Sequence, residues 1–312
     1  MLLNWLIAIA SVAGLWLGGT WIVNSAARIA RRVGLSELVI GLTIVAIGTS
    51  APEFAVTIVA ALEGKENISV SNVIGSNIFN LGFILGGVAI VSAIPTTRKL
   101  VRREGSMVII STLLLLVFLT DLRLAAWEGA LLILGLASYV IYVLSTSKTD
   151  DEDAKEVMGE VPTGEFRWLD VPILIGGLAT ILISGHFLVQ SATEIARQLG
   201  LSDWVIGVTI VAAGTSAPEL ATALIGVLRK REGISLGTLI GSDLFNLMGV
   251  LGLASLLHPM TVTSDAYGSL FLLTALSVVV VVMMRTGWRI SRREGVLLVA
   301  INLVRWMADF IG

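Results

Sequence analysis

The sequence contains no cysteine and only two histidines among its 312 residues. Disulfide bonds and thiolate metal centres are therefore excluded, and a zinc site would have almost no ligands to draw on. The chain also lacks a Gly-x-x-x-x-Gly-Lys-Ser/Thr phosphate loop, which argues against any process driven by ATP. We accordingly expect neither an enzyme nor a protein with a bound cofactor.

Charged residues are scarce as well. They make up 14% of the chain, against about a quarter in soluble domains, while 55% of the residues are hydrophobic and the mean hydropathy is +0.91. The basic residues are dispersed among short segments, so no nucleic-acid surface is expected. This composition predicts an all-α polytopic membrane protein whose main partner is the lipid bilayer, with no obligate protein partner evident.

Ten segments are long and apolar enough to cross a membrane as helices, on the criterion of roughly 20 apolar residues. They cover residues 2–25, 35–62, 68–94, 105–119, 125–144, 171–197, 201–228, 234–257, 266–284 and 292–311. The start of the chain lacks the basic region and cleavage pattern of a signal peptide, so the first segment is expected to be retained. Residues 145–170 form the only long polar stretch. Its acidic run lacks the spaced ligands of an EF-hand loop, which favours a solvated linker over a calcium sensor.

An internal repeat relates the two parts of the chain on either side of this linker. A shift of 166 residues (219 − 53) carries residues 34–86 onto 200–252 without a gap, and more than half of the positions are identical. Each part, 1–144 and 171–312, holds five of the expected helices. An odd number of helices makes the two copies enter the membrane from opposite sides. We therefore predict ten transmembrane helices in two inverted-topology five-helix repeats, an arrangement found in secondary transporters.

The loop charges predict an orientation independently. When successive loops are assigned to alternate sides, one side receives most of the 21 lysines and arginines, and the other side receives only Lys65, Arg123, Arg197 and Arg305. By the positive-inside rule, the loop after the first segment and the linker 145–170 are cytoplasmic. Both termini are then extracellular, and we expect the protein in the cell membrane.

The hexapeptide Gly-Thr-Ser-Ala-Pro-Glu occurs twice, at residues 48–53 and 214–219, inside apolar segments. A charge at the centre of a bilayer costs about 2.5–3.5 kcal/mol on insertion scales, so Glu53 and Glu219 indicate a function. Pro52 lies four residues after Gly48 and is expected to break the helix, which would free carbonyls around Ala46–Gly48. Carboxylates, hydroxyls and free carbonyls are hard oxygen donors that suit Ca²⁺ or Na⁺.

A second repeated motif, Gly-Ser-Asn-Ile-Phe-Asn at 75–80 and Gly-Ser-Asp-Leu-Phe-Asn at 241–246, places a serine and an asparagine four residues apart on one helix face. These small polar residues either pack helices together or contribute ligands. Asp243 breaks the symmetry, since Asn77 occupies the equivalent position. A further cation ligand, a proton carrier and a structural residue are all open interpretations of Asp243.

The paired motifs resemble the two alpha-repeats, here 34–86 and 200–252, of the prokaryotic sodium/calcium exchanger family within the calcium/cation antiporter superfamily. With the ten-segment plan, the resemblance covers nearly the whole chain. It implies alternating access by sliding of the first and sixth segments against a core of the other eight. It also implies a metal site whose residues are Thr49, Glu53, Thr215 and Glu219 for Ca²⁺, the carbonyls of Ala46 and Ala212 with Ser50, Ser76, Ser216 and Ser242 for Na⁺, and Asn80 and Asn246 at a central position.

The sequence departs from the family where some members carry an acid at the position of Asn246, including the potassium-dependent ones. This departure argues against K⁺ co-transport. We therefore predict an antiporter that exchanges Na⁺ for Ca²⁺ at one shared site by alternating access. The alternatives are a H⁺/Ca²⁺ antiporter that uses the same glutamates, a cation channel, and a purely structural membrane scaffold.

Overall fold

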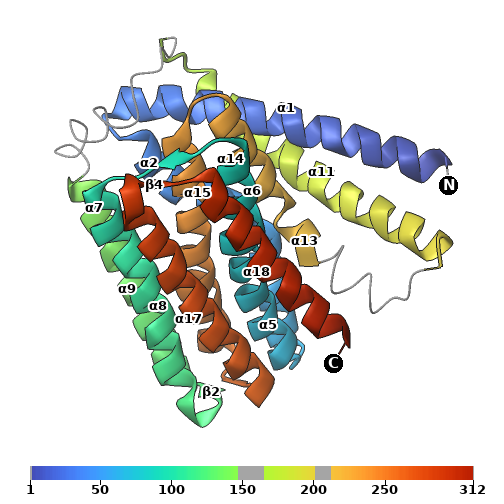
Figure 1. Ribbon diagram of the computed structural model, residues 1–312, viewed down its shortest axis with the longest axis vertical. Coiled ribbons are helices and arrows are strands. Elements are labelled where there is room, and N and C mark those ends of the chain that lie inside the picture. The colour runs from blue at the N-terminus through green and yellow to red at the C-terminus, as the bar shows by residue number, and fades with distance from the viewer. Residues whose placement is uncertain (1, 147–164, 201–211, 312) are drawn as a thin grey trace.

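The computed structural model of the protein describes residues 2–146, 165–200 and 212–311. Within these ranges nearly all of the chain is helical (Figure 1). The helices up to the linker are α1 (Leu2–Val33), α2 (Glu37–Ile40), η1 (Gly41–Val45), α3 (Ala46–Thr49), α4 (Ala51–Leu62), α5 (Glu66–Phe79), η2 (Asn80–Ile84), α6 (Leu85–Val91), α7 (Arg98–Leu100), η3 (Val101–Gly105), α8 (Ser106–Phe118), η4 (Leu119–Asp121) and α9 (Ala126–Thr146). Those after the linker are α11 (Asp170–Gln198), α13 (Ala212–Thr215), α14 (Ala217–Leu228), α15 (Glu232–Leu244), η7 (Phe245–Val250), α16 (Leu251–Leu257), α17 (Ser264–Arg285), η8 (Thr286–Trp288) and α18 (Arg292–Ile311).

Seven candidate membrane spans lie among the described residues. They are Leu2–Val33, Glu66–Val91, Arg98–Asp121, Ala126–Thr146, Asp170–Gln198, Glu232–Leu257 and Ser264–Trp288. The bent pair Glu37–Thr49 and Ala51–Leu62 makes an eighth if it crosses as one span. The expected seventh segment, 201–228, lies partly outside the described residues, and its described part includes the shorter apolar helix α14. The expected tenth segment is helical as α18, but α18 is not one of these candidate spans.

The helices extend further than the hydropathy of the sequence predicts. Helix α1 continues beyond residue 25 through three arginines to Val33. The helical stretch expected to begin at residue 105 starts seven residues earlier, at Arg98. An apolar run measures where a chain enters lipid, whereas the backbone hydrogen bonds of a helix persist into the polar interface.

Four two-residue strands, which the sequence analysis did not predict, join the two halves of the chain. Strand β1 (Ile94–Pro95) pairs with β4 (Arg289–Ile290), and β2 (Arg123–Leu124) pairs with β3 (Met260–Thr261). The 166-residue shift carries β1 onto β3 and β2 onto β4, so it exchanges one two-stranded ribbon for the other. The labels β4 and β2 mark opposite ends of the bundle in Figure 1.

Inside the bundle, two glycine contacts between the halves are also related by the 166-residue shift. A Cβ atom on Gly129 of α9 would lie 2.4 Å from the carbonyl oxygen of Gly252 in α16. The equivalent Gly295 of α18 would place a Cβ atom 2.6 Å from the carbonyl oxygen of Gly86 in α6. Both helix crossings therefore need glycine, and each of them joins one half of the chain to the other.

The contacts between loops sort into two groups, one at each end of the bundle. At one end, Arg231 bridges Glu37 at 2.5 Å, Arg28 bridges Asp170, and β1 pairs with β4. At the other end, Glu66 meets His258 at 3.3 Å, and β2 pairs with β3. Each of these contacts joins residues that lie in or next to expected loops, and the alternation of sides assigns the two loops to the same side of the membrane. The first group contains the loops that the sequence predicts to be basic.

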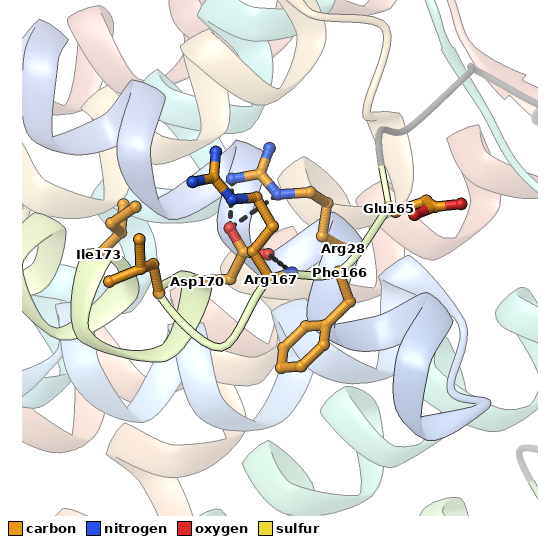
Figure 2. A pocket seen from close by; sticks show the side chains of 7 residues that line it. Arg28, Glu165, Phe166, Arg167, Asp170 and Ile173 are labelled. Atoms are coloured by element: carbon orange, nitrogen blue, oxygen red, sulfur yellow. Dashed lines mark hydrogen bonds and ion pairs between the residues drawn. The ribbon is translucent and has the colours of Figure 1, made fainter.

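Helices α1 and α11 run side by side and cross the rest of the bundle obliquely (Figure 1). The two helices are antiparallel, because Gly14 faces Ser184, whereas the later residue Ile22 faces the earlier residue Gly177. Near one end, the guanidinium of Arg28 in α1 bonds to the Asp170 carboxylate in α11 through Nε at 2.8 Å and through a second nitrogen at 2.6 Å (Figure 2). The two helices therefore pack closely in the middle, and an ion pair joins them near one end.

Candidate cation site

The helix that carries the first hexapeptide bends by 49° at Ser50. Ser50 has φ −78° and ψ 11° and separates α3 from α4, whose first turn contains Pro52. Ser216 takes nearly the same conformation, φ −88° and ψ 8°, ahead of α14. A proline in the first turn of a helix loses no hydrogen bond, since that N–H has no partner within the helix. The repeated Ser-Ala-Pro-Glu therefore begins a new helix and places the glutamate in its first turn.

One expectation about the backbone near this bend is wrong. The Ala46 carbonyl was expected to be free, but it accepts hydrogen bonds from the Ser50 N–H at 3.0 Å and the Thr49 hydroxyl at 3.1 Å. The helix therefore stays intact up to Ser50, beyond the position of the predicted break. Ala212 is the first residue of α13 and directly follows a stretch outside the described residues.

Each glutamate is held by the serine of the opposite half. The Ser50 hydroxyl donates to Oε1 of Glu219 at 2.9 Å, and the Ser216 hydroxyl donates to Oε1 of Glu53 at 3.0 Å. All four side chains are fully buried. The 166-residue shift exchanges one hydrogen bond for the other, so each carboxylate accepts a bond from the equivalent serine of the opposite half.

Three more predicted ligands lie against these carboxylates. Ser242 donates to Oε1 of Glu219 at 3.3 Å, and its oxygen lies 3.4 Å from the Thr49 hydroxyl. Thr49 also lies against the Glu219 carboxylate, and Thr215 lies against that of Glu53. The repeats thus bring together the hydroxyls and carboxylates that the sequence singled out.

Ser76 is a predicted ligand for which the structure describes no hydrogen bond to a carboxylate. It is buried, but its equivalent Ser242 is the one that donates to a glutamate in the described structure. A separate cluster contains Asn80 and Asn246. Asn80 donates to the Asp243 carboxylate, and Asn246 donates to the side-chain oxygen of Asn77. Asn77 was not among the predicted ligands, although its equivalence to Asp243 could have indicated it.

The two glutamates have no basic partner among the described residues. Neither takes part in an ion pair among the described residues, and the second carboxylate oxygen of each, Oε2, is buried there without a hydrogen-bond partner. Within the same residues, no group of three or more acidic or histidine side chains could hold a metal ion. The cavity shown in Figure 2 contains none of the predicted ligands. The oxygen-rich centre between the hexapeptides is therefore formed by two carboxylates, with hydroxyls as the other donors.

Buried carboxylates that lack protein counter-charges, inside an all-helical membrane bundle, are characteristic of transporters that take up cations. Comparison with known proteins then gives the family. Residues 3–145 and 170–304 match the family described as sodium/calcium exchanger protein, and the chain belongs to this family. It is therefore a membrane-embedded ion antiporter.

Individual relatives match over most of their length. The protein CaxA of Alkalimonas amylolytica is 38% identical over 88% of this chain and 89% of its own. The sodium/calcium exchanger MaX1 of Methanosarcina acetivorans is 33% identical, with 95% of each chain covered. Among solved structures, the sodium-calcium exchanger NCX_Mj soaked with 2.5 mM Na⁺ and 10 mM Sr²⁺ superposes with a TM-score of 0.84 at 29% identity, covering 97% of both chains.

Proposed function

We propose that this protein exchanges Na⁺ for Ca²⁺ at a single site between the two hexapeptides, by alternating access. The observation that carries the proposal is the exchanged pair of hydrogen bonds from Ser50 to Glu219 and from Ser216 to Glu53. It brings two carboxylates to one centre, and together they balance one Ca²⁺. The Ca²⁺ ligands in this proposal are Thr49, Glu53, Thr215 and Glu219.

Competition for shared carboxylates explains the coupling. Two uncompensated anions are costly to bury, so a conformational change with an empty site is slow, and the site changes sides when cations fill it. Na⁺ would use the oxygens of Ser50, Ser76, Ser216 and Ser242 with the same glutamates. Because the Ala46 carbonyl already accepts two hydrogen bonds, its contribution would need one of them to open.

The fold proposed for this function has ten transmembrane helices in two inverted repeats, 1–144 and 171–312, joined by a cytoplasmic linker at 145–170. The exchange of β1·β4 for β2·β3 under the 166-residue shift supports the inversion, because it places equivalent strands at opposite ends. In the proposed cycle α1 and α11 slide as a pair against the other helices. Their mutual packing and oblique direction favour motion as one unit.

The test of the function is ⁴⁵Ca²⁺ uptake into proteoliposomes that contain the purified protein. We expect a Na⁺ gradient to drive uptake and a pH gradient alone to drive none. Uptake driven by pH alone would transfer the coupling to protons at the same glutamates. Fast passive flux without either gradient would instead indicate a channel.

Glutamine substitutions test the shared site. Glu53→Gln and Glu219→Gln each remove one of the two charges that balance Ca²⁺, so we expect uptake at the background level in both. Glu63→Gln is the matched control, because Glu63 is exposed and pairs only with Lys65 among the described residues. Uptake retained in either site variant, with the control also active, would contradict the shared site.

A further inference from the structure

A cavity of about 670 Å³ opens at the end of the bundle that carries β1 and β4. It lies between α7, η3 and the start of α8 on one side and the last turns of α9 on the other. The labels α7 and β4 mark this end of the bundle in Figure 1. The volume is in the range of pockets that hold small molecules. The lining side chains that matter below are four basic residues and two tyrosines, Arg98, Lys99, Arg102, Arg103, Tyr139 and Tyr142.

The cavity carries positive charge that the described residues do not balance. None of the described residues that line it is acidic. The buried Glu104 pairs with Arg103 at 2.6 Å, but Arg98 and Arg102 take part in no ion pair in the described part of the chain. The guanidinium of Arg98 lies 6.0 Å from the ring centre of Trp288, and such a cation–π contact does not use the N–H donors. Two guanidinium groups can therefore bind an anion.

The fold itself does not require these charges. The equivalent stretch of the second half forms the first turns of α17 without a basic residue at any of the four positions. Positive charge at this end agrees with the predicted orientation, but an orientation signal needs no cavity. The 166-residue shift carries Arg98, Lys99, Arg102 and Arg103 onto Ser264, Asp265, Gly268 and Ser269.

A buried hydroxyl group at the cavity independently indicates a ligand. Tyr139 lines the cavity and is only 7% exposed. Its hydroxyl is buried without a hydrogen-bond partner among the described residues. A buried polar group without a partner is unfavourable, and this cost disappears when a ligand accepts its hydrogen bond. The cavity thus combines unbalanced positive charge with an unused donor.

We propose that this cavity binds the phosphate group of an anionic phospholipid. In this site Arg98 and Arg102 bind the phosphate oxygens, and the hydroxyl of Tyr139 donates a further hydrogen bond. The planar guanidinium group suits phosphate because it presents two parallel N–H donors. Basic pockets between transmembrane helices are a recurring binding mode for lipid head groups. The inference adds a lipid site to the protein and does not depend on which cations are exchanged.

The surroundings of the cavity favour a lipid over a soluble phosphate. Met107 of α8 also lines the cavity. Ile110 lies one turn further along α8, and Leu113 and Val117 continue the same face; all three are exposed and apolar. They belong to the candidate membrane span Arg98–Asp121. An acyl chain can lie along this face while the phosphate occupies the cavity, whereas a soluble phosphate would gain nothing from these residues.

The experiment follows the thermal unfolding of the purified full-length protein in a neutral detergent. Dioctanoyl phosphatidylglycerol, dioctanoyl phosphatidylcholine and inorganic phosphate are added in separate titrations. A ligand of the folded state raises the unfolding temperature, and we expect this effect from phosphatidylglycerol alone. An equal rise with phosphatidylcholine would overturn the charge-specific site. An equal rise with inorganic phosphate at the same concentration would overturn the lipid as its ligand.

A double variant tests the charges of the cavity. We expect Arg98→Gln/Arg102→Gln to raise the phosphatidylglycerol concentration at half of the temperature shift about 10- to 30-fold. Arg229→Gln/Lys230→Gln is the matched control, because it removes two charges from exposed residues of a loop at the same end, outside the cavity. The control should bind like the wild type. An equal loss in both double variants would indicate general attraction to the basic surface and would overturn the inference.

The variant Tyr139→Phe tests the hydroxyl with every charge kept. We expect its unfolding temperature without lipid to be no lower than that of the wild type, because the hydroxyl has no described partner to lose. Its half-saturating phosphatidylglycerol concentration should still rise several-fold. Binding equal to that of the wild type would overturn the proposed site at Tyr139. This variant decides the question even if the double variant does not fold, and none of these measurements depends on transport.

Discussion

Individual hydroxyl groups hold the two central carboxylates, and the serine of each hexapeptide bonds to the carboxylate that the other half supplies. A hydrogen bond to a charged group contributes about 1.5–3 kcal/mol, more than a neutral one. Ser50 and Ser216 orient Glu219 and Glu53 in this way. The geometry of the glutamates therefore depends on the serines as much as on their own helices.

We predict that Ser50→Ala and Ser216→Ala each weaken Ca²⁺ binding about 10- to 100-fold, because each leaves one buried carboxylate without its serine. The measurement is Na⁺-driven ⁴⁵Ca²⁺ uptake as a function of Ca²⁺ concentration. Ser71→Ala is the control, since this exposed hydroxyl bonds to carbonyls of its own helix. A large loss in one site variant and none in the other would contradict the equivalence of the two hydrogen bonds.

The carboxylates were predictable from the sequence and part of their surroundings was not. The repeated hexapeptide identified Glu53 and Glu219 because a charged residue in an apolar segment is costly to bury. The Ala46 carbonyl was predicted to be free from the position of Pro52, but the backbone bends at Ser50 and leaves that carbonyl bonded. Local rules locate a bend only approximately, since the tertiary contacts decide which residue takes the non-helical angles.

At the scale of helices and strands, α15 and η1 approach each other closely near the site. A Cβ atom on Gly241 would lie 2.3 Å from the carbonyl oxygen of Leu42 and 2.7 Å from the Cβ atom of Ala46. Gly241 directly precedes Ser242, whose hydroxyl bonds to Glu219. This approach of two backbones thus sets the position of a site residue.

We predict that Gly241→Ala lowers the thermal stability of the detergent-solubilised protein and weakens Ca²⁺ binding, because the added methyl group forces the two helices apart at a cost of about 1–3 kcal/mol. Gly268→Ala on α17 is the matched control. A Cβ atom there meets nothing within 4 Å, and alanine favours the helix. If the two variants unfold at the same temperature, the close approach of α15 and η1 is unimportant for stability.

The long apolar helices were predictable, because each is marked by a hydrophobic run of the required length. The four strands were not, since two residues show no periodicity and their pairing joins positions about 140 to 200 residues apart. The continuation of α1 to Val33 was missed for a related reason. The three arginines near its end limit entry into lipid without interrupting the backbone hydrogen bonds of the helix.

At the scale of the whole molecule, the absence of cysteine allows the proposed orientation to be tested directly. Lys65 and Arg102 are exposed, and the predicted segments assign them to opposite sides of the membrane. We predict that Lys65→Cys reacts with a membrane-impermeant maleimide added outside intact cells. Arg102→Cys should react only after the membrane is opened. Labelling of both from the same side would contradict the proposed alternation of the loops.

The net charge carried by the exchanged ions predicts how the transport rate responds to the membrane voltage. One Ca²⁺ carries two positive charges, so exchange for more than two Na⁺ moves net charge across the membrane. We expect the rate of Na⁺-driven Ca²⁺ uptake to change with the membrane potential set by K⁺ and valinomycin. Transport that is insensitive to voltage would indicate a balanced exchange of two Na⁺ for one Ca²⁺.

The crossed contacts between the halves also constrain how this sequence can change over generations. Ser50 bonds to Glu219, β1 pairs with β4, and Gly129 approaches Gly252, so each of these contacts has one member in each half. A mutation at one of these positions therefore changes a contact with the other copy of the repeat. At such contact positions, a change in one copy requires a matching change in the other. We therefore expect the two copies to keep the greatest sequence similarity at the interface between them.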